Sequence, residues 1–303
     1  MAVRSTGRLR LREDDVAGYL FMLPALAILG VFLIGPLLYQ FYLSLFDYDI
    51  LAPQNARFIG LANYMEALTR DPIVWRSLKN ILIYAAGVVP TQMIIALGLA
   101  VLVNSRIRTG KTAFRTIFFL PTVTSVVVVS FIFLFIYSSN GILNYLLQPF
   151  GVAARNWMQD PRTALPSIMA TAVWSTVGQY FVINLAGLQD IPEHLYEAAA
   201  IDGATPWQQF RYITFPLLAP TTFFIATMST IGTLQVFDQM YLMTGGEGGP
   251  ANSTMTMVLY IYKNVFGGYF RVGYGSALAV ILFLIILVLT LIQRRFFGRE
   301  VQY

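Results

Sequence analysis

The feature that most constrains this chain is a set of six long stretches without a single Asp, Glu, Lys or Arg. They cover residues 19–46, 80–105, 116–154, 163–189, 212–237 and 272–293. Each is longer than the roughly 18 apolar residues that indicate a membrane-spanning helix. The sequence therefore predicts an all-α, polytopic membrane protein with six transmembrane helices. In the third stretch the apolar part ends near Tyr137, and a turn is expected at residues 138–141.

The composition supports this class and limits the chemistry. Hydrophobic residues make up 57% of the chain and charged residues 12%, whereas a soluble domain carries about 25% charged residues. The chain has no cysteine and one histidine, His194. A disulfide and a thiolate metal site are therefore excluded, and we predict neither a metal site nor a cofactor.

The distribution of basic residues predicts that both termini are cytoplasmic. Twelve of the 20 lysines and arginines then lie inside, and the other eight are spread over longer outer loops. Residues 1–18 form a basic cytoplasmic tail, and a second cytoplasmic tail covers 294–303. Segment 19–46 is too long for the core of a cleaved signal peptide, so we predict a retained first transmembrane helix.

The remaining chain is predicted to form an extracytoplasmic loop at 47–77 and one core transmembrane domain at 78–293. That core includes a cytoplasmic loop at 189–216. Prolines within the spans act either as hinges or as kinks that help packing; they are Pro24, Pro36, Pro90, Pro121, Pro166 and Pro220. Two outer segments, 47–77 and the glycine-rich 245–250, either dock an extracytoplasmic protein or cap the bundle.

The cytoplasmic loop at 189–216 predicts two short helices joined by a turn. Pro192 can begin the first helix, and Gly203 can end it. Thr205 can cap the second helix, with a proline directly after it. Small residues beside Glu197 leave a shallow surface, and its carboxylate offers one charge to a basic partner group. The loop is therefore suited to contact with another protein.

Residues 197–203, with the sequence EAAAIDG, resemble the EAA loop of the permeases of binding-protein-dependent ABC importers. Residues 58–64, 241–246 and 273–277 resemble the carbohydrate-uptake branch of that family, the maltose permease type. The resemblance implies a type I importer transmembrane domain whose loop enters a cleft on the ATPase. The residues that it assigns to this coupling are Glu197, Ala198, Ala199, Asp202 and Gly203.

The resemblance also implies a function and partners. The chain is expected to carry a sugar or related polyol into the cytoplasm by alternating access, in the bacterial plasma (inner) membrane. Its implied partners are a second related permease, two ATPase subunits and an extracytoplasmic solute-binding protein, and no nucleic acid. The chain itself is not expected to be an enzyme. Its Gly-Lys-Thr string at 110–112 lacks the earlier glycine of a phosphate-binding loop, so ATP hydrolysis belongs to a separate subunit.

Two helix faces are predicted to line the solute path, because their small and hydroxyl residues recur at helical spacing. They are Ala172, Ser175, Thr176 and Gln179 in the fourth span and Ser229, Gly232, Thr233 and Val236 in the fifth. Such faces can bind a polyhydroxylated solute, and they equally suit helix packing in lipid. The resemblance places these eight at sugar-contacting positions, of which only Ser229 is unchanged. Trp174 and Gln235 are further candidates, and Asp238 lies either on the path or at the interface.

Two alternatives remain open at this point. A secondary transporter normally carries ionisable residues inside its spans, and the six stretches contain none, which disfavours that class. An importer of a non-sugar solute, such as glycerol phosphate, stays possible because most path-facing residues differ from those of the sugar-importing branch.

Overall fold

The computed structural model describes residues 13–106 and 111–297, so much of the predicted tails (1–12 and 298–303) and residues 107–110 lie outside the described residues. The long helices are α1 (Glu13–Leu29), α2 (Gly35–Leu43), α4 (Pro72–Arg106), α5 (Lys111–Val123), α6 (Val126–Ile136), α8 (Ala164–Gln189), α12 (Ala219–Leu234) and α15 (Val272–Phe297). The short helices are α3 (Ala62–Thr69), α7 (Ile142–Leu147), α9 (Glu193–Ile201), α10 (Pro206–Gln209), α11 (Phe215–Leu217), α13 (Asp238–Thr244) and α14 (Met257–Val265). One small hairpin was not predicted: β1 (Phe46–Asp47) pairs antiparallel with β2 (Arg57–Phe58).

Within the described residues, four helical segments are long and apolar enough to cross a membrane, and two bent pairs bring the number to six. The four are Gly18–Leu43, Pro72–Asn104, Ala164–Gln189 and Val272–Arg295. The six predicted spans are matched when each bent pair is counted as one span. The second span begins earlier than predicted, because α4 starts at Pro72, inside the segment expected to be a loop.

The third span is broken. Helices α5 and α6 are inclined by 93° to one another, with the break at Thr124 and Ser125. Pro121 lies one turn before the break, and Ser125 has a non-helical backbone, with φ −54° and ψ 131°. A proline removes a backbone donor and crowds the preceding turn, which explains why the helix ends here. The turn expected at residues 138–141 is present, since α6 ends at Ile136 and α7 begins at Ile142.

The fifth span is bent by 64° between the segments Pro206–Leu217 and Ala219–Thr244. The residue at the bend, Leu218, lies between Pro216 and Pro220, which accounts for its position. A proline does not always have this effect. Pro90 lies inside α4, which continues through it as one helix.

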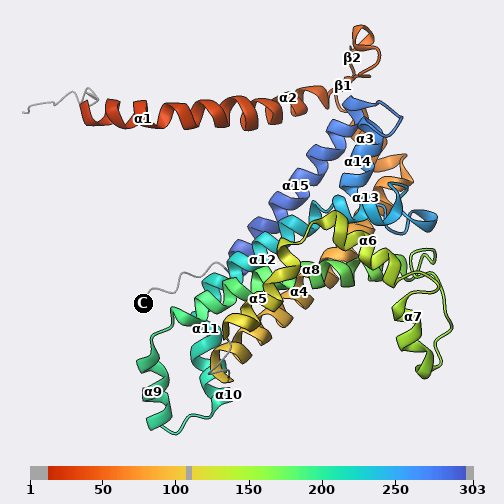
Figure 1. Ribbon diagram of the computed structural model, residues 1–303. Coiled ribbons are helices and arrows are strands. Elements are labelled where there is room, and N and C mark those ends of the chain that lie inside the picture. The colour runs from red at the N-terminus through yellow and green to blue at the C-terminus, as the bar shows by residue number, and fades with distance from the viewer. Residues whose placement is uncertain (1–12, 107–110, 298–303) are drawn as a thin grey trace, which may run out of the picture.

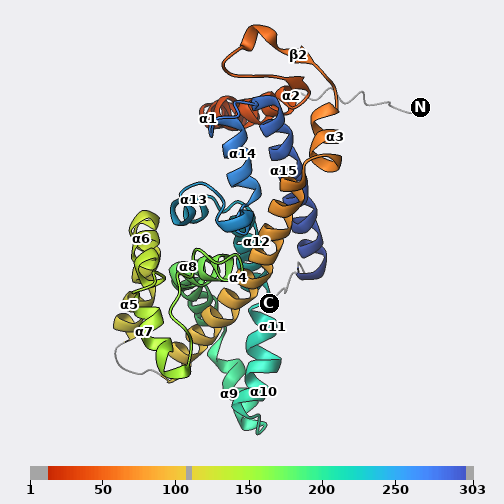
Figure 2. The same cartoon turned by 90° about the vertical axis from the view of Figure 1, so that its right-hand side faces the viewer.

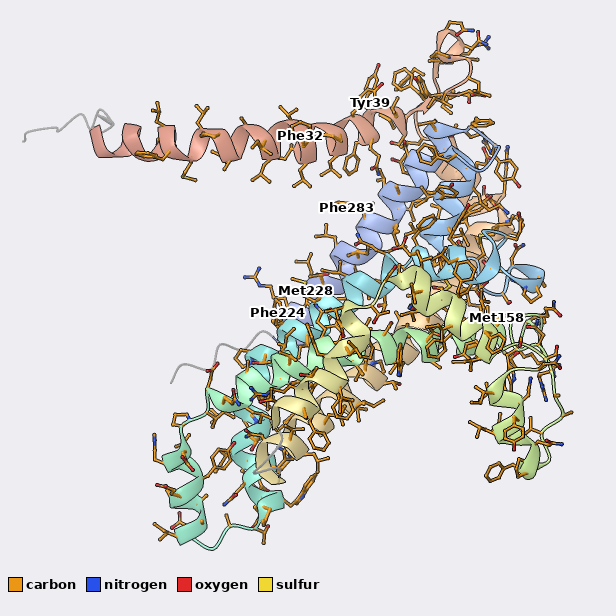
Figure 3. The ribbon with its side chains drawn as sticks, in the orientation of Figure 1. Phe32, Tyr39, Met158, Phe224, Met228 and Phe283 are labelled. Carbon is orange, nitrogen blue, oxygen red and sulfur yellow. The ribbon has the colours of Figure 1, made fainter. Side chains whose placement is uncertain are left out.

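The N-terminal rod, which we define as residues 18–43, stands away from the other helices over most of its length (Figure 1), and its end packs on α15, where the rings of Phe41 and Phe283 lie 6.0 Å apart. It consists of α1 and α2 with a π turn at Gly30–Ile34 between them, and none of its most apolar window is buried. Phe32 and Tyr39 project from it (Figure 3), with 75% and 56% of their surface exposed. The segment after the rod is attached through Asn63, whose side-chain amide donates to the carbonyl oxygens of Ser44 and Phe46 at 2.9 and 3.0 Å. The rest of the rod depends on lipid or another protein for cover.

The other spans form a bundle around α4 and α8, as the two views show (Figures 1 and 2). Gly178 on α8 lies against α5 so closely that a Cβ there would overlap the backbone carbonyl oxygen of Phe118. One buried cluster, around Tyr84 and Ile168, fills the half of the bundle nearest the hairpin. A second cluster, around Phe181, fills the other half. Close backbone approach at small residues is how helices associate in lipid.

Asp71, directly before α4, joins three helices. Its Oδ2 accepts hydrogen bonds from the hydroxyl of Tyr260 on α14, at 2.6 Å, and from that of Tyr274 on α15, at 2.7 Å. Burial and the Asp71 carboxylate both raise the pKa of Tyr260, so its hydroxyl stays protonated and remains a donor. The beginnings of α4 and α15 and the middle of α14 are therefore held together at one end of the bundle.

Candidate functional site

A cavity of about 420 Å³ lies in the bundle where α4, α5, α6, α8, α12 and α13 come together. Tyr84 of the first buried cluster and Tyr180 of the second both contribute to its wall. Amide, hydroxyl and carboxylate groups supply much of its wall, from Gln92, Thr122, Thr124, Ser175, Thr176, Gln179, Ser229, Thr233, Gln235, Asp238 and Gln239. A cavity with polar groups on its wall, inside an apolar bundle, is where a membrane protein can hold a hydrophilic solute.

Ten residues were predicted to line the solute path, and nine of them lie on the wall of this one cavity. From α8 they are Ala172, Ser175, Thr176 and Gln179, and from α12 they are Ser229, Gly232 and Thr233. Gln235 and Val236 also line it, although they lie in the turn after α12 ends at Leu234. The helical spacing therefore identified two faces that meet. Their contact with solute stays a prediction.

Trp174 is the member of the set that does not line the cavity. Its ring packs against Phe133 of α6, with the centroids 5.2 Å apart, and 46% of its surface is exposed. Trp174 sits two residues after Ala172 and one before Ser175, so helical geometry turns it away from the face that they share.

Gln92 on α4 is a cavity residue that the sequence analysis did not identify. It is 2% exposed, and its side chain joins three helices. Its Nε2 donates to the Ser229 hydroxyl on α12, and its Oε1 accepts from the Thr176 hydroxyl on α8 at 2.7 Å. The available signal was an amide in the middle of an apolar stretch, since polar residues inside spans usually face the interior.

The far wall of the cavity is formed by the beginning of α13. Gln239 is buried and donates from Nε2 to the Ser175 hydroxyl at 3.3 Å. Its neighbour Asp238 is exposed and lines the cavity. The sequence allowed Asp238 to lie either on the solute path or at the membrane interface. In the fold it lies on the cavity wall.

The predicted coupling residues lie on a helical projection at the opposite end of the molecule from the hairpin (Figure 1). Helix α9 begins after Pro192, as expected, and Gly203 follows its end with φ +80°. Thr205 caps α10 by accepting from the Gln208 backbone N–H, and the Gln208 side chain accepts from the Thr205 N–H. Both predicted caps are thus formed, and they define a rigid turn between α9 and α10.

The surface of this projection is largely open. Glu197, Ala198, Asp202 and Gly203 are exposed, and Ala199 is half-buried. The sequence analysis did not identify the apolar residues beside them: Ile201 is 87% exposed and Trp207 is 69% exposed. Large exposed apolar side chains around a small-residue surface are typical of a protein interaction site.

Among the described residues, no three His, Cys, Asp or Glu side chains are grouped as a metal site would require. The chemistry that the cavity offers is hydrogen bonding from neutral amides and hydroxyls and from the Asp238 carboxylate, together with the aromatic residues Tyr84, Tyr180 and Phe237. These groups suit the binding of a hydroxyl-rich molecule.

A scan against family models matches residues 92–301 to "Binding-protein-dependent transport system inner membrane component". The lactose transport system permease protein LacF of Rhizobium radiobacter is 37% identical over 295 residues, which cover 97% of both chains. The trehalose/maltose transport system permease protein MalF of Thermococcus litoralis is 34% identical over 288 residues, which cover 95% of both.

A solved structure has a similar fold. It is a bacterial ABC transporter involved in the import of the acidic polysaccharide alginate, and one of its chains superposes with a TM-score of 0.79 at 24% sequence identity. The match covers 96% of this chain and 98% of the other.

Proposed function

Because the chain belongs to the family of binding-protein-dependent transport system inner membrane components, we propose that it is the permease subunit of an ATP-driven carbohydrate importer. In this role it moves a sugar or related polyol into the cytoplasm by alternating access. The observation that carries the proposal is the single cavity lined by two predicted helix faces and by Gln92.

The curated relatives support the choice of a carbohydrate. Their names refer to lactose, to trehalose and maltose, and to arabinooligosaccharides. The cavity supports it independently, because amides and hydroxyls both donate and accept hydrogen bonds, as a sugar's hydroxyl groups do. Aromatic faces such as Phe237 add the flat apolar surface on which a sugar ring can pack.

The projection formed by α9 and α10 is the proposed contact with the ATPase. The exposed Glu197 and the shallow surface of Ala198 and Ala199 would enter the partner, with the apolar Ile201 and Trp207 at the rim. In this proposal two ATPase subunits bind on the cytoplasmic side, a second permease lies alongside, and a solute-binding protein delivers solute from the opposite side. ATP hydrolysis then takes place outside this chain.

A continuous mechanical path connects the projection to the cavity. Helix α10 continues through the π turn at Phe210–Thr214 into α11, and after the bend at Leu218 the chain becomes α12. The projection is braced at its base, since the hydroxyls of Tyr196 and Thr214 lie 2.9 Å apart. Ser229 lies three turns along α12 on the cavity wall. A displacement of α9 can therefore reach the cavity through one bent helix.

The proposal is tested by replacing Glu197→Lys and, separately, Gly203→Leu in the reconstituted importer. We expect uptake to be lost while the amount of inserted permease is unchanged, because the contact with the ATPase is disturbed and the bundle is not. Asp160→Lys serves as the charge-reversal control, because Asp160 lies in the loop before α8 rather than in the projection, where it pairs with Arg155 at 3.9 Å and accepts from the Arg162 backbone N–H at 2.8 Å. Normal uptake in both coupling variants would contradict the coupling role.

The solute class needs its own measurement. The complete importer, with its binding protein, is presented with neutral sugars, polyols and non-sugar solutes, and stimulated ATP hydrolysis is recorded. Stimulation by sugars supports the proposal. Stimulation by non-sugar solutes alone would contradict the proposal that the solute is a carbohydrate, and it would leave the assignment as an importer permease unchanged.

A further inference from the structure

Asp238 is the one charged side chain among the described residues that line the cavity. The other polar groups of the wall are neutral amides and hydroxyls, including those of Gln92, Gln179 and Gln235. The described residues provide Asp238 with no ion pair: the three salt bridges found join Arg155, Lys263 and Arg271 to other carboxylates. Asp238 therefore lies on the cavity wall without an ion pair within 4.0 Å among the described residues.

An unpaired carboxylate has a large effect in this position. Apolar helices surround the cavity, and walls of low dielectric constant concentrate the field of a charge into the space between them. Asp238 is itself exposed, so salt screens part of this field, and the effect is largest at low ionic strength. A solute that enters the cavity therefore meets a negative potential together with neutral hydrogen-bonding groups.

We propose that Asp238 makes the cavity a charge filter, which accepts neutral or amino-substituted sugars and rejects sugars that carry carboxylate, sulfate or phosphate groups. This inference rests on the proposed function, and it narrows the solute class within it. An anionic solute would have to lose water opposite a carboxylate, and the described wall residues include no Lys or Arg to pair with it, which is unfavourable. The filter also disfavours glycerol phosphate, the alternative solute that the sequence left open.

The absence of cysteine from the chain allows a direct measurement of this potential. Gly232→Cys places one thiol in the cavity, and no heavy atom lies within 4 Å of the Cβ that it adds. Rates of modification by a cationic and by an anionic thiosulfonate reagent are measured from the mass of this chain in the assembled, ATP-free importer. Gln235→Cys repeats the test at a second cavity position, and exposed Ser139→Cys, outside the cavity wall, is the control.

We expect the cationic reagent to react faster at both cavity positions. In the two cavity cysteine variants, Asp238→Asn should lower the ratio of the modification rate with the cationic reagent to that with the anionic reagent by about tenfold. Asp238→Lys should invert this ratio. The ratio at Ser139→Cys should be unaffected by either change. A ratio at the cavity thiols that does not depend on residue 238, or thiols that neither reagent reaches, would overturn the filter.

A second measurement separates this inference from the proposed function. Stimulation of ATP hydrolysis is compared for neutral sugars and for sugar acids of matched length, each delivered by a binding protein that accepts it. If neutral sugars do not stimulate ATP hydrolysis with the unaltered permease, the proposed function is wrong, irrespective of the rates of thiol modification. If neutral sugars succeed and sugar acids are accepted equally, the function stands and the filter is wrong.

Discussion

The N-terminal rod and helix α8 are both apolar spans, and they have opposite environments. The rod has a mean hydropathy of 2.4 over its most apolar 18-residue window, and none of that window is buried by the rest of the chain. Helix α8 has a mean hydropathy of only 1.2, and half of its window is buried. The more polar of the two spans is thus the one that the protein surrounds.

This difference arises because the solvent around the spans is lipid rather than water. Lipid tails are as apolar as a leucine side chain, so moving an apolar residue from lipid into the protein interior gives little favourable free energy. The rod accordingly exposes Phe32 and Leu38 along its length. Helix α8 instead presents small and polar residues, such as Gly178 and Thr171, to its neighbours. Close packing and hydrogen bonds therefore select the contacts in this bundle.

The largest expected effect comes from adding volume to the glycine that α8 uses for packing. Gly178→Val should prevent the close approach of α5 and α8, because even a Cβ would overlap the Phe118 carbonyl oxygen. We expect most of the folded permease to be lost in detergent, measured by size-exclusion chromatography with fluorescence detection. Gly30→Val in the rod, where a Cβ meets nothing within 4 Å, is the control and should leave the yield unchanged. Equal losses would show that the rod packs as tightly as α8.

A smaller effect is expected from removing a buried ring. Phe181 on α8 is fully buried, and its ring lies 5.8 Å from that of Phe118. Phe181→Ala should lower the free energy of unfolding by about 3 kcal/mol, because it leaves a cavity. Phe32→Ala in the rod should change it by less than about 0.5 kcal/mol. Thermal unfolding of the two purified variants compares them, and similar losses would mean that rod and bundle are stabilised alike.

The attachment at the end of the rod should give a more local effect. Asn63→Ala leaves the carbonyl oxygens of Ser44 and Phe46 without their amide donor, at a cost of about 1 to 2 kcal/mol. Hydrogen exchange should increase around these residues while the exchange of α8 is unchanged. Asn55→Ala, an exposed change in the segment before α3, is the control. Faster exchange throughout α8 would contradict the separation of the two regions.

The smallest effect is expected at the polar contact between helices. Gln92→Leu removes the side chain that links Ser229 and Thr176, and such contacts in membranes contribute about 1 kcal/mol. The thermal midpoint should fall slightly, and the cavity should lose selectivity among sugars. Ile94→Leu, on the exposed side of the same helix, should change neither property. An unchanged solute profile in the Gln92 variant would restrict this residue to packing.

Local features were predictable to the level of single residues. Charge-free stretches located all six spans, and the Gly203 and Thr205 caps were predicted from residue types alone. Caps are formed by atoms within three or four positions of one another, so no distant contact is needed to produce them. Helical spacing also identified the two faces on α8 and α12 that meet at the cavity.

Other features escaped prediction for physical reasons. The break at Thr124 and Ser125 follows Pro121, yet Pro90 leaves α4 unbroken, because neighbouring helices determine whether the freed backbone groups are satisfied. Trp174 was assigned to the solute path by residue type, and the geometry of α8 turns it toward Phe133. Gln92 was missed because its partners lie on other helices, with Ser229 137 positions away along the chain.

By itself, the sequence determined which segments enter the membrane and how the coupling projection is capped. Both depend on short-range properties: the cost of moving charge into lipid and the needs of backbone groups at helix ends. The tertiary structure alone decided where the spans bend, which polar groups from three helices share one cavity, and that Asp238 stands on its wall. These features depend on close packing between distant residues, and in lipid no difference in hydrophobicity marks the side of a helix that will pack.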